Sequence, residues 1–152
     1  MKKVLVTPRS VTAEGGHPSL DKLKAAGFDV VFSSAGMLPA EAELCRLLPG
    51  CIGYLAGVEK ITARVLQSAP GLKVISRNGV GTDNIDLQTA GDLSIKVCKA
   101  PGSNARGVAE LAMGYAFSLA RSIPISDKKI KAAEWKRTIG IELKGKTLGI
   151  IG

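Results

Sequence analysis

Short apolar runs alternate with amphipathic helical patterns through the first hundred residues, and this alternation constrains the fold more than any other feature of the sequence. The connections between the runs are short, which favours parallel strands joined by right-handed crossovers. We therefore expect an α/β fold with helices on both faces of a parallel sheet, and a ligand site at the carboxyl ends of its strands. Strands are expected at residues 3–7, 28–33, 51–55, 72–76 and 95–98, with helices at residues 19–26, 39–48, 62–69 and 86–91.

The pattern changes after Ala100-Pro101-Gly102, where a longer helix is predicted to begin at Asn104. Pro124 interrupts the helical pattern, Ser126 is expected to cap a further helix, and residues 146–151 have the pattern of a strand. The long helix carries an apolar stripe, which either packs inside its own chain or contacts a partner subunit. The stripe consists of Val108, Leu111, Ala112, Tyr115 and Leu119.

Composition excludes several classes of protein. With 45% hydrophobic and 22% charged residues in 152, the chain has the composition of an ordinary globular protein. No apolar run is long enough to span a bilayer, and the N-terminal run ends at Thr7-Pro8, too early for a signal peptide. The expected location is therefore the cytoplasm. The three cysteines have no metal-binding spacing and are interpreted as small buried hydrophobes, and the single His17 is interpreted as a solvated loop residue, so no metal site is expected.

The formal net charge of +8 raises the question of nucleic acid. The basic residues are dense only at residues 128–137, where Trp135 is the only aromatic residue among them. A surface that binds nucleic acid by stacking needs more aromatic side chains. We therefore expect no nucleic-acid partner, and attribute the charge to an anionic ligand or to a basic part of a more neutral whole.

The stretch at residues 76–86, S-R-N-G-V-G-T-D-N-I-D, carries the clearest chemical signal. It directly follows a predicted strand, so it lies at the carboxyl edge of the sheet. Gly79 and Gly81 let a ligand approach the backbone N–H groups, and Arg77 adds a permanent charge suited to a carboxylate or phosphate. The residues alone leave two alternatives open: an anion site, or a tight glycine turn with Arg77 in a surface ion pair.

A second stretch, K-A-P-G-S-N-A-R-G-V-A-E at residues 99–110, also follows a strand and opens a helix. Asn104 is placed either to cap that helix or to bind a ligand, and capping alone is the favoured interpretation.

Together these stretches resemble the D-2-hydroxyacid dehydrogenase family, and within it the phosphoglycerate dehydrogenases. The shared motifs are R-x-G-V-G-x-D-N-I-D, A-P-G-x-N-x-x-x-V-A-E-L, A-R-x-I-P, E-W and E-L-x-G-K-T-L-G-I-I-G, and they extend over essentially the whole chain. The resemblance implies a flavodoxin-like substrate-binding domain at residues 1–100 and, at residues 101–152, the start of an NAD-binding Rossmann domain with dimerisation helices. It also implies substrate binding by Arg77, Asn78, Gly79, Val80, Gly81 and Asn104, with Val80 also bordering the nicotinamide.

The resemblance also implies what the chain lacks. Gly152 corresponds to the first glycine of the dinucleotide fingerprint, and the catalytic Arg, Glu and His of the family lie beyond it. We therefore expect no catalytic residue in these 152 residues, and a fragment that is inactive alone. Ala56-Gly57 stands where some phosphoglycerate dehydrogenases carry an Arg-Ser pair for the phosphate, which weakens the case for 3-phosphoglycerate.

The expected function is that of an oxidoreductase that transfers a hydride between NAD and a D-2-hydroxy acid. The partners expected are a small 2-hydroxy or 2-oxo acid and a second copy of the chain, bound through residues 104–140. The alternative is a non-enzymatic module that binds small carboxylates or another protein. The side chain of the acid and the preference between NAD and NADP stay open.

Overall fold

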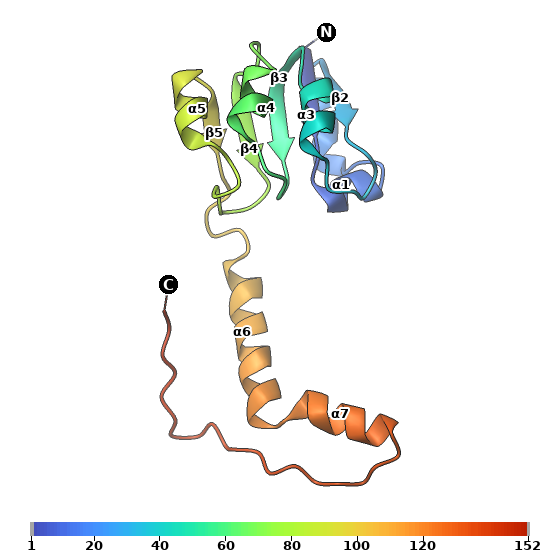
Figure 1. Cartoon of the computed structure of the whole chain (residues 1–152), viewed down its shortest axis with the longest axis vertical. Helices are drawn as coiled ribbons and strands as arrows, with labels where there is room; N and C mark the ends of the chain where they lie inside the picture. The colour runs from blue at the N-terminus through green and yellow to red at the C-terminus, as the bar shows by residue number, and fades with distance from the viewer. Residues whose placement is uncertain (1, 152) are drawn as a thin grey trace. The chain divides into compact units, whose positions relative to one another are not determined.

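A computed structural model describes residues 2–151 of the chain, which divide after Ser103 into two compact units (Figure 1). Each unit is described by itself. The last strand of the first unit ends at Cys98, and the long helix of the second unit begins at Ala105.

The first unit alternates strands and helices from end to end (Figure 1). Its elements are β1 (Lys2–Val6), α1 (Arg9–Ala13), a 3₁₀ turn η1 (Pro18–Leu20), α2 (Asp21–Ala25), β2 (Phe28–Phe32), α3 (Glu41–Leu47), β3 (Cys51–Ala56), α4 (Ala63–Gln67), β4 (Val74–Arg77), α5 (Leu87–Asp92) and β5 (Lys96–Cys98).

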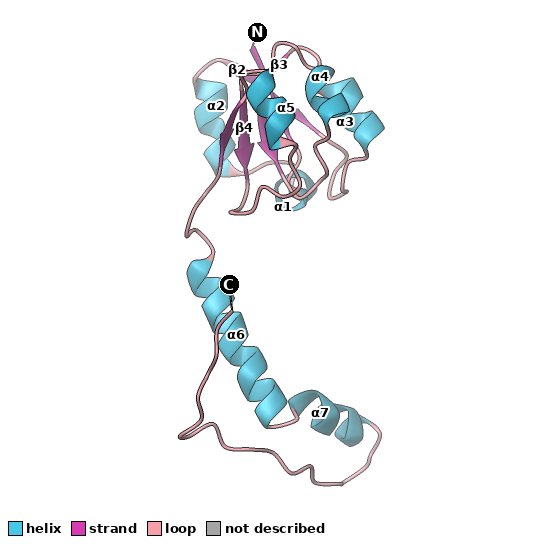
Figure 2. Ribbon diagram, turned by 60° about the vertical axis from the view of Figure 1, so that its left-hand side comes forward, coloured by secondary structure: helices cyan, strands magenta, loops and turns pink. Residues whose placement is uncertain are grey.

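The five strands form one parallel sheet in the order β2-β1-β3-β4-β5, which confirms the predicted α/β fold. The order reverses at β1, because the chain steps outward to β2 and then returns across β1 to β3. Right-handed crossovers in the two directions place helices on opposite faces. Figure 2 accordingly shows α2 on one side of the sheet and α3 and α4 on the other.

The main core lies between the sheet and helices α3, α4 and α5. Leu5, Tyr54 and Ile75 are neighbours in register on three adjacent strands, and all three are buried. Side chains from the helices close over them, chiefly Leu44 and Val65. On the opposite face of the sheet, the segment that contains α2 covers β1. An apolar hollow of about 290 Å³ lies next to this segment and is lined partly by residues of β3 and β4.

Two helices of the first unit begin with a side-chain cap. Thr62 Oγ1 accepts from the N–H of Val65 at 3.4 Å, and a carboxylate oxygen of Asp86 accepts from the N–H of Thr89 at 2.9 Å. These bonds satisfy N–H groups that an isolated helix leaves free.

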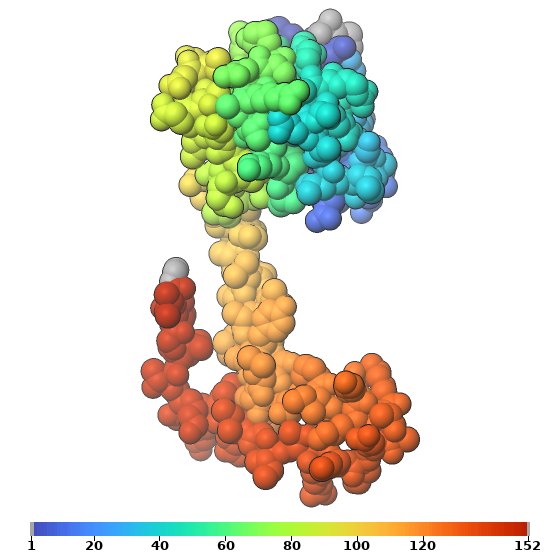
Figure 3. All heavy atoms as spheres, in the orientation of Figure 1, coloured from blue at the N-terminus to red at the C-terminus, as the bar shows by residue number. Residues whose placement is uncertain are grey.

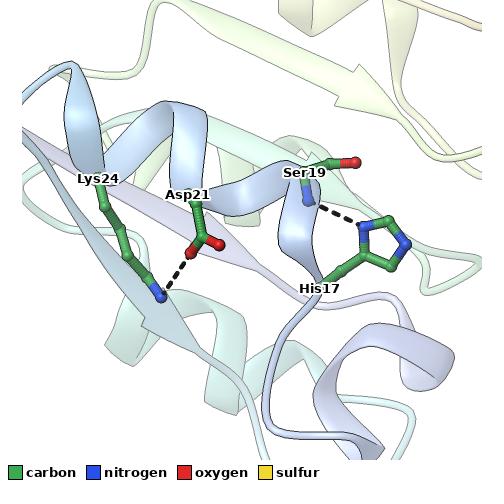
Figure 4. A network of polar contacts seen from close by, with 4 residues as sticks. All are labelled: His17, Ser19, Asp21 and Lys24. Atoms are coloured by element: carbon green, nitrogen blue, oxygen red, sulfur yellow. Dashed lines mark hydrogen bonds and ion pairs between the residues drawn. The ribbon is translucent and has the colours of Figure 1, made fainter.

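The segment around His17 differs in detail from the single helix predicted at residues 19–26. His17 Nδ1 accepts from the N–H of Ser19 at 3.1 Å and starts η1, and α2 follows (Figure 4). Lys24 pairs with Asp21 along α2 at 3.3 Å. The His17 side chain is thus an exposed local cap, in agreement with its interpretation as a solvated loop residue.

All three cysteines are free, as expected, but only Cys51 is fully buried, whereas Cys45 and Cys98 are half-buried. Burial raises the pKa of the Cys51 thiol, which keeps it protonated and unreactive. Within residues 2–151, no three potential metal ligands gather in one place. In the same part of the chain, no helix combines the length and the apolar character needed to cross a membrane.

The second unit contains α6 (Ala105–Ala120) and α7 (Ile123–Lys131), followed by an extended segment. The apolar stripe of α6 is exposed in this unit: Tyr115 is 61% exposed and Leu119 is 79% exposed. Of its two possible roles, packing inside the unit is therefore not observed.

Three sequence predictions in the second unit are wrong. Asn104 stands at the N-cap of α6, but its side chain makes no capping hydrogen bond. The next helix starts after Ser122, which adopts a left-handed conformation with Pro124 in the first turn, so Ser126 lies inside the helix. Residues 146–151 form no strand, because a strand needs a hydrogen-bonded neighbour and the described part of this unit offers none. In Figure 3 this red segment is a single exposed line of atoms.

Candidate functional site

The loop after β4 lies at the carboxyl edge of the sheet, where the sequence predicted it. Backbone hydrogen bonds tie it to two neighbouring segments: Asn78 N–H donates to the carbonyl of Ala56 at 2.8 Å, and Ala100 N–H donates to the carbonyl of Gly79 at 3.0 Å. The loop is therefore held between the end of β3 and the chain that leaves β5. This anchoring gives the loop a fixed position over the edge of the sheet.

The backbone conformation at position 79 and the adjacent Arg77 side chain both require a glycine there. Its φ of +150° lies in a region that residues with a side chain rarely adopt. A Cβ at this position would lie 2.9 Å from Arg77 Nη1, so the guanidinium packs against the bare face of Gly79. The guanidinium also donates to the carbonyl of Asn78. Arg77 is thus folded over its own loop instead of extending into solvent.

Two consecutive N–H groups of this loop are free. Neither the N–H of Val80 nor that of Gly81 has a protein acceptor among residues 2–151. Both residues are exposed, Val80 to 36%. Arg77 forms no ion pair within the described part of the chain, so its alternative role in a surface ion pair is not observed. Free N–H groups beside an unpaired guanidinium suit a carboxylate.

A hollow of about 230 Å³ adjoins this loop. Its walls come from the carboxyl ends of three adjacent strands, β1, β3 and β4. Arg77 and Asn78 form one side, and the segment after β3 forms another with Gly57 and Glu59. This is the place in a parallel sheet where ligands usually bind, next to the strand at which the order reverses.

Glu59 is a buried carboxylate that the sequence reasoning missed. It is only 1% exposed, and its Oε1 atom accepts hydrogen bonds from three donors. Tyr54 Oη donates at 2.6 Å, the N–H of Gly57 donates at 2.9 Å, and the hydroxyl of Thr7 also donates. A lone acidic residue just after an apolar strand, in G-V-E-K-I, was the available signal. The role of Glu59 depends on Thr7, which follows β1 and lies 52 residues earlier in the chain.

The same network perturbs Tyr54. Burial of the ring raises the pKa of its phenol well above the usual range, and the adjacent Glu59 carboxylate raises this pKa further. Tyr54 therefore stays protonated and serves as a fixed hydrogen-bond donor, which suits a structural role in holding Glu59.

The remaining predicted site residues lie elsewhere. Asn104 is exposed at the start of the second unit, and Gly152 lies outside the described residues. Within the first unit the structure brings together Arg77, Asn78, Gly79, Val80 and Gly81 in one loop, and adds Glu59 beside it.

The described residues do not fit a dinucleotide site. A pyrophosphate needs a strand, a glycine-rich turn and the N-terminus of the following helix. Residues 146–151 form neither strand nor helix, and Leu148 and Ile150 on them are exposed. Residues 2–151 thus lack the elements that hold a pyrophosphate.

Comparison with known proteins agrees with this fold. The D-3-phosphoglycerate dehydrogenase of Archaeoglobus fulgidus is 37% identical over the whole chain, which spans 28% of that protein. A hydroxypyruvate reductase of Thermotoga maritima is 41% identical over 72% of the chain and 37% of its own length. The chain therefore spans less than two fifths of the length of these curated relatives.

Solved structures show the same likeness. The TT0316 protein of Thermus thermophilus superposes with a TM-score of 0.82 at 30% identity, over 94% of this chain and 46% of that one. The NAD+-bound 3-phosphoglycerate dehydrogenase of Entamoeba histolytica gives 0.73 at 27% identity, over 94% and 43%. The sequence model of the family described as D-isomer specific 2-hydroxyacid dehydrogenase, catalytic domain, matches residues 5–146. The chain therefore belongs to that family.

Proposed function

We propose that this chain supplies the substrate-binding part of an oxidoreductase that transfers a hydride between NAD and a D-2-hydroxy acid, of the phosphoglycerate dehydrogenase type. The observation that carries the proposal is the pair of free N–H groups at Val80 and Gly81, next to the unpaired guanidinium of Arg77. Every 2-hydroxy and 2-oxo acid has a carboxylate. This loop is built to accept one.

In this proposal, the carboxylate of the acid receives hydrogen bonds from the N–H groups of Val80 and Gly81, and Arg77 contributes its charge. Because the backbone donors are fixed before the acid binds, little conformational entropy is lost on binding. Gly79 allows the guanidinium to lie close to the loop, and Asn78 anchors the loop to β3. The described residues orient the acid.

The proposal extends to the organisation of the whole protein. The first unit is the substrate-binding domain, and its Val80 borders the nicotinamide. The second unit begins the NAD-binding domain, where Asn104 reaches the substrate and Gly152 is the first glycine of the dinucleotide fingerprint. The NAD+ named with the Entamoeba structure supports the choice of cofactor. The three free cysteines support a reducing, cytoplasmic location.

A homo-oligomer formed through residues 104–140 completes the proposal. The support is the apolar stripe of α6, which has no cover in its own unit. Contiguous exposed apolar surface of this kind marks association sites. A second copy is the occupant, since the stripe is presented by every copy of the chain.

The test is a titration of the isotope-labelled 152-residue chain with D-lactate, followed by amide chemical shifts in NMR spectra. The amides of Val80 and Gly81 should shift in a saturable manner. Arg77→Ala should weaken this binding by about tenfold, the order expected for a hydrogen bond to a charged group.

Arg64→Ala is the matched control, because Arg64 is an exposed arginine on α4 in an ion pair with Glu41. It should leave the titration unchanged. Lactate binding that shifts no amide of the loop, or that survives Arg77→Ala unchanged, would contradict the proposal.

A further inference from the structure

Asn78 is followed directly by Gly79 in the loop after β4, and this pair of residues is chemically reactive. An asparagine loses its side-chain amide when the backbone nitrogen of the next residue attacks the side-chain carbonyl carbon. A side chain on that next residue hinders the attack, whereas a glycine leaves the approach open. Of the three asparagines in the sequence, only Asn78 precedes a glycine, because Asn84 precedes isoleucine and Asn104 precedes alanine.

The Asn78 side chain is not held in place by the fold. It is exposed, and no side-chain hydrogen bond among residues 2–151 involves its amide group. Asn84 in the same segment is half-buried, its amide donates to the carbonyl of Glu59 at 2.7 Å, and the next residue is the buried Ile85. The same chemical group is therefore fixed at residue 84 and unrestrained at residue 78.

Two backbone hydrogen bonds anchor the loop, but neither is on the peptide plane that has to move. The N–H of Asn78 donates to the carbonyl of Ala56 at 2.8 Å, and the carbonyl of Gly79 accepts from the N–H of Ala100 at 3.0 Å. The plane between these anchors carries the N–H of Gly79, which donates to the carbonyl of Arg77 at 2.8 Å and closes a three-residue turn. Rotation of this one plane turns the Gly79 nitrogen toward the Asn78 side chain and leaves both anchors intact.

Gly79 and Arg77 both favour the reaction. Because Gly79 has no Cβ, its φ can follow the rotation of the peptide plane without a steric clash. The guanidinium of Arg77 packs against this glycine, where a Cβ would lie 2.9 Å from Nη1. A positive charge this close favours the deprotonated form of the attacking nitrogen and the negative oxygen that develops on the side-chain carbonyl. The loop thus combines an accessible nucleophile with a nearby cation.

We propose that Asn78 is a site of spontaneous deamidation in the folded chain. The backbone nitrogen of Gly79 forms a bond with Cγ of Asn78 and gives up its proton, the bond between Cγ and Nδ2 breaks, and the side-chain nitrogen leaves as ammonia. Solvent water, the only co-reactant, then opens the resulting succinimide ring at one of its two carbonyls. Residue 78 becomes aspartate, or isoaspartate when the main chain runs through the side-chain carbonyl. Either product adds a carboxylate to the loop.

The consequence for ligand binding rests on the proposed function. The new carboxylate lies in the same loop as the guanidinium of Arg77 and the free N–H groups of Val80 and Gly81. It competes with an acid ligand for the guanidinium and repels the charge of that ligand. Isoaspartate also makes the main chain of the loop one carbon longer, which displaces the N–H groups relative to the guanidinium. Binding of a small carboxylate therefore declines as the protein ages.

The test follows the folded 152-residue chain over time at constant temperature and pH, by peptide mass spectrometry. Trypsin cleaves after Arg77 and Lys96, so Asn78 and Asn84 are recovered in one peptide and Asn104 in another. Fragmentation of the peptides assigns the conversion to individual residues and distinguishes aspartate from isoaspartate. Conversion should occur at Asn78 and give both products, while Asn84 and Asn104 stay intact.

A synthetic peptide of residues 74–82 gives the reference rate. The folded chain should react no more than about tenfold more slowly, because the rotation opens short-range hydrogen bonds and unfolds no element. Asn78→Gln is the matched control: it keeps a side-chain amide, but the larger ring closes more slowly, so residue 78 should stay unmodified. An Asn78 that stays intact in the folded chain while the peptide converts overturns the proposal, and so does conversion of Asn84 at the same rate.

Titrations with D-lactate before and after incubation separate this inference from the proposed function. Affinity should fall by about tenfold in the fully converted native chain and stay constant over time in Asn78→Gln. An equal fall in both, or conversion without any fall, overturns the consequence for binding. Conversion at Asn78 in a chain that binds no D-lactate when fresh supports the deamidation site and contradicts only the proposed function.

Discussion

The hydroxyl of Tyr54 donates a hydrogen bond of 2.6 Å to Glu59 Oε1, and this bond joins the main core to the candidate site. Tyr54 is on β3 and belongs to the main core, whereas Glu59 follows the turn at Gly57. The bond therefore fixes the chain after β3 against the core. It also couples the stability of the first unit to the position of Glu59.

Tyr54→Phe should destabilise the first unit by about 1–3 kcal/mol, because it leaves a buried charged acceptor with one donor fewer. Urea unfolding followed by circular dichroism would measure the loss. Equal stability of Tyr54→Phe and the native chain would show that the Tyr54–Glu59 hydrogen bond does not stabilise the first unit.

The raised pKa of Tyr54 also predicts a dependence of stability on alkaline pH. In the unfolded chain Tyr54 loses its proton near its ordinary pKa of 10.0, whereas in the folded chain burial and Glu59 keep it protonated. Above that pH the folded state binds more protons than the unfolded state, so the free energy of unfolding falls as pH rises. The contribution is fully present below pH 10 and is lost above it. Tyr54→Phe should show a shallower decline in unfolding measurements between about pH 9 and pH 11.

Gly79→Ala should cost about 1–3 kcal/mol in stability, because an alanine is strained at a φ of +150°. Its Cβ would also displace the Arg77 guanidinium, so binding of D-lactate should weaken in the same variant. Gly91→Ala is the control: it lies in helix α5 with open space around the added Cβ. The midpoint temperature of thermal unfolding should be unchanged or slightly raised in Gly91→Ala. A Gly79→Ala variant more stable than Gly91→Ala would refute the requirement for glycine at position 79.

Self-association through the second unit should depend on the α6 stripe. Light scattering of the native chain should show an assembly larger than a monomer, and the double variant Leu111→Glu, Leu119→Glu should shift it toward the monomer, because charges are costly in an apolar contact. Leu93→Glu introduces the same change on the exposed surface of the first unit and should leave the assembly intact. A native chain that stays monomeric at high concentration would contradict the prediction.

A polypeptide of these 152 residues alone should show no NAD-dependent turnover of D-glycerate or D-lactate. The described residues lack the glycine turn and helix N-terminus that bind a pyrophosphate, and hydride transfer needs both reactants held in register. Absorbance at the NADH wavelength should stay flat. Turnover that persists in highly purified chain and disappears in Arg77→Ala would overturn this expectation.

The sequence alone was sufficient to predict the features that depend on residues close together in the chain. Thr62 and Asp86 are side chains that hydrogen-bond a few residues ahead, so their capping could be predicted without the fold. The parallel order could be predicted because short crossovers leave few alternatives. The Arg77–Gly81 loop could be placed because it directly follows a strand.

Two of the failures depend on distant partners. The pattern of residues 146–151 is that of a strand, but strand formation requires a neighbour that local pattern does not reveal. Asn104 is a residue type suited to capping, yet its side chain makes no capping bond. Glu59 has the sequence context of an ordinary turn residue, and its role depends on Thr7 and Tyr54 meeting it in three dimensions.

The position of β1 has a consequence for handling the protein. Strand β1 is flanked on both sides, by β2 and by β3, so it cannot complete its hydrogen bonds until β3, which ends at Ala56, has been synthesised. Deleting residues 2–6 would divide the sheet and leave β2 without a partner, whereas trimming β5 removes only an edge strand. Deletions that remove part of β1 should therefore abolish expression of folded protein.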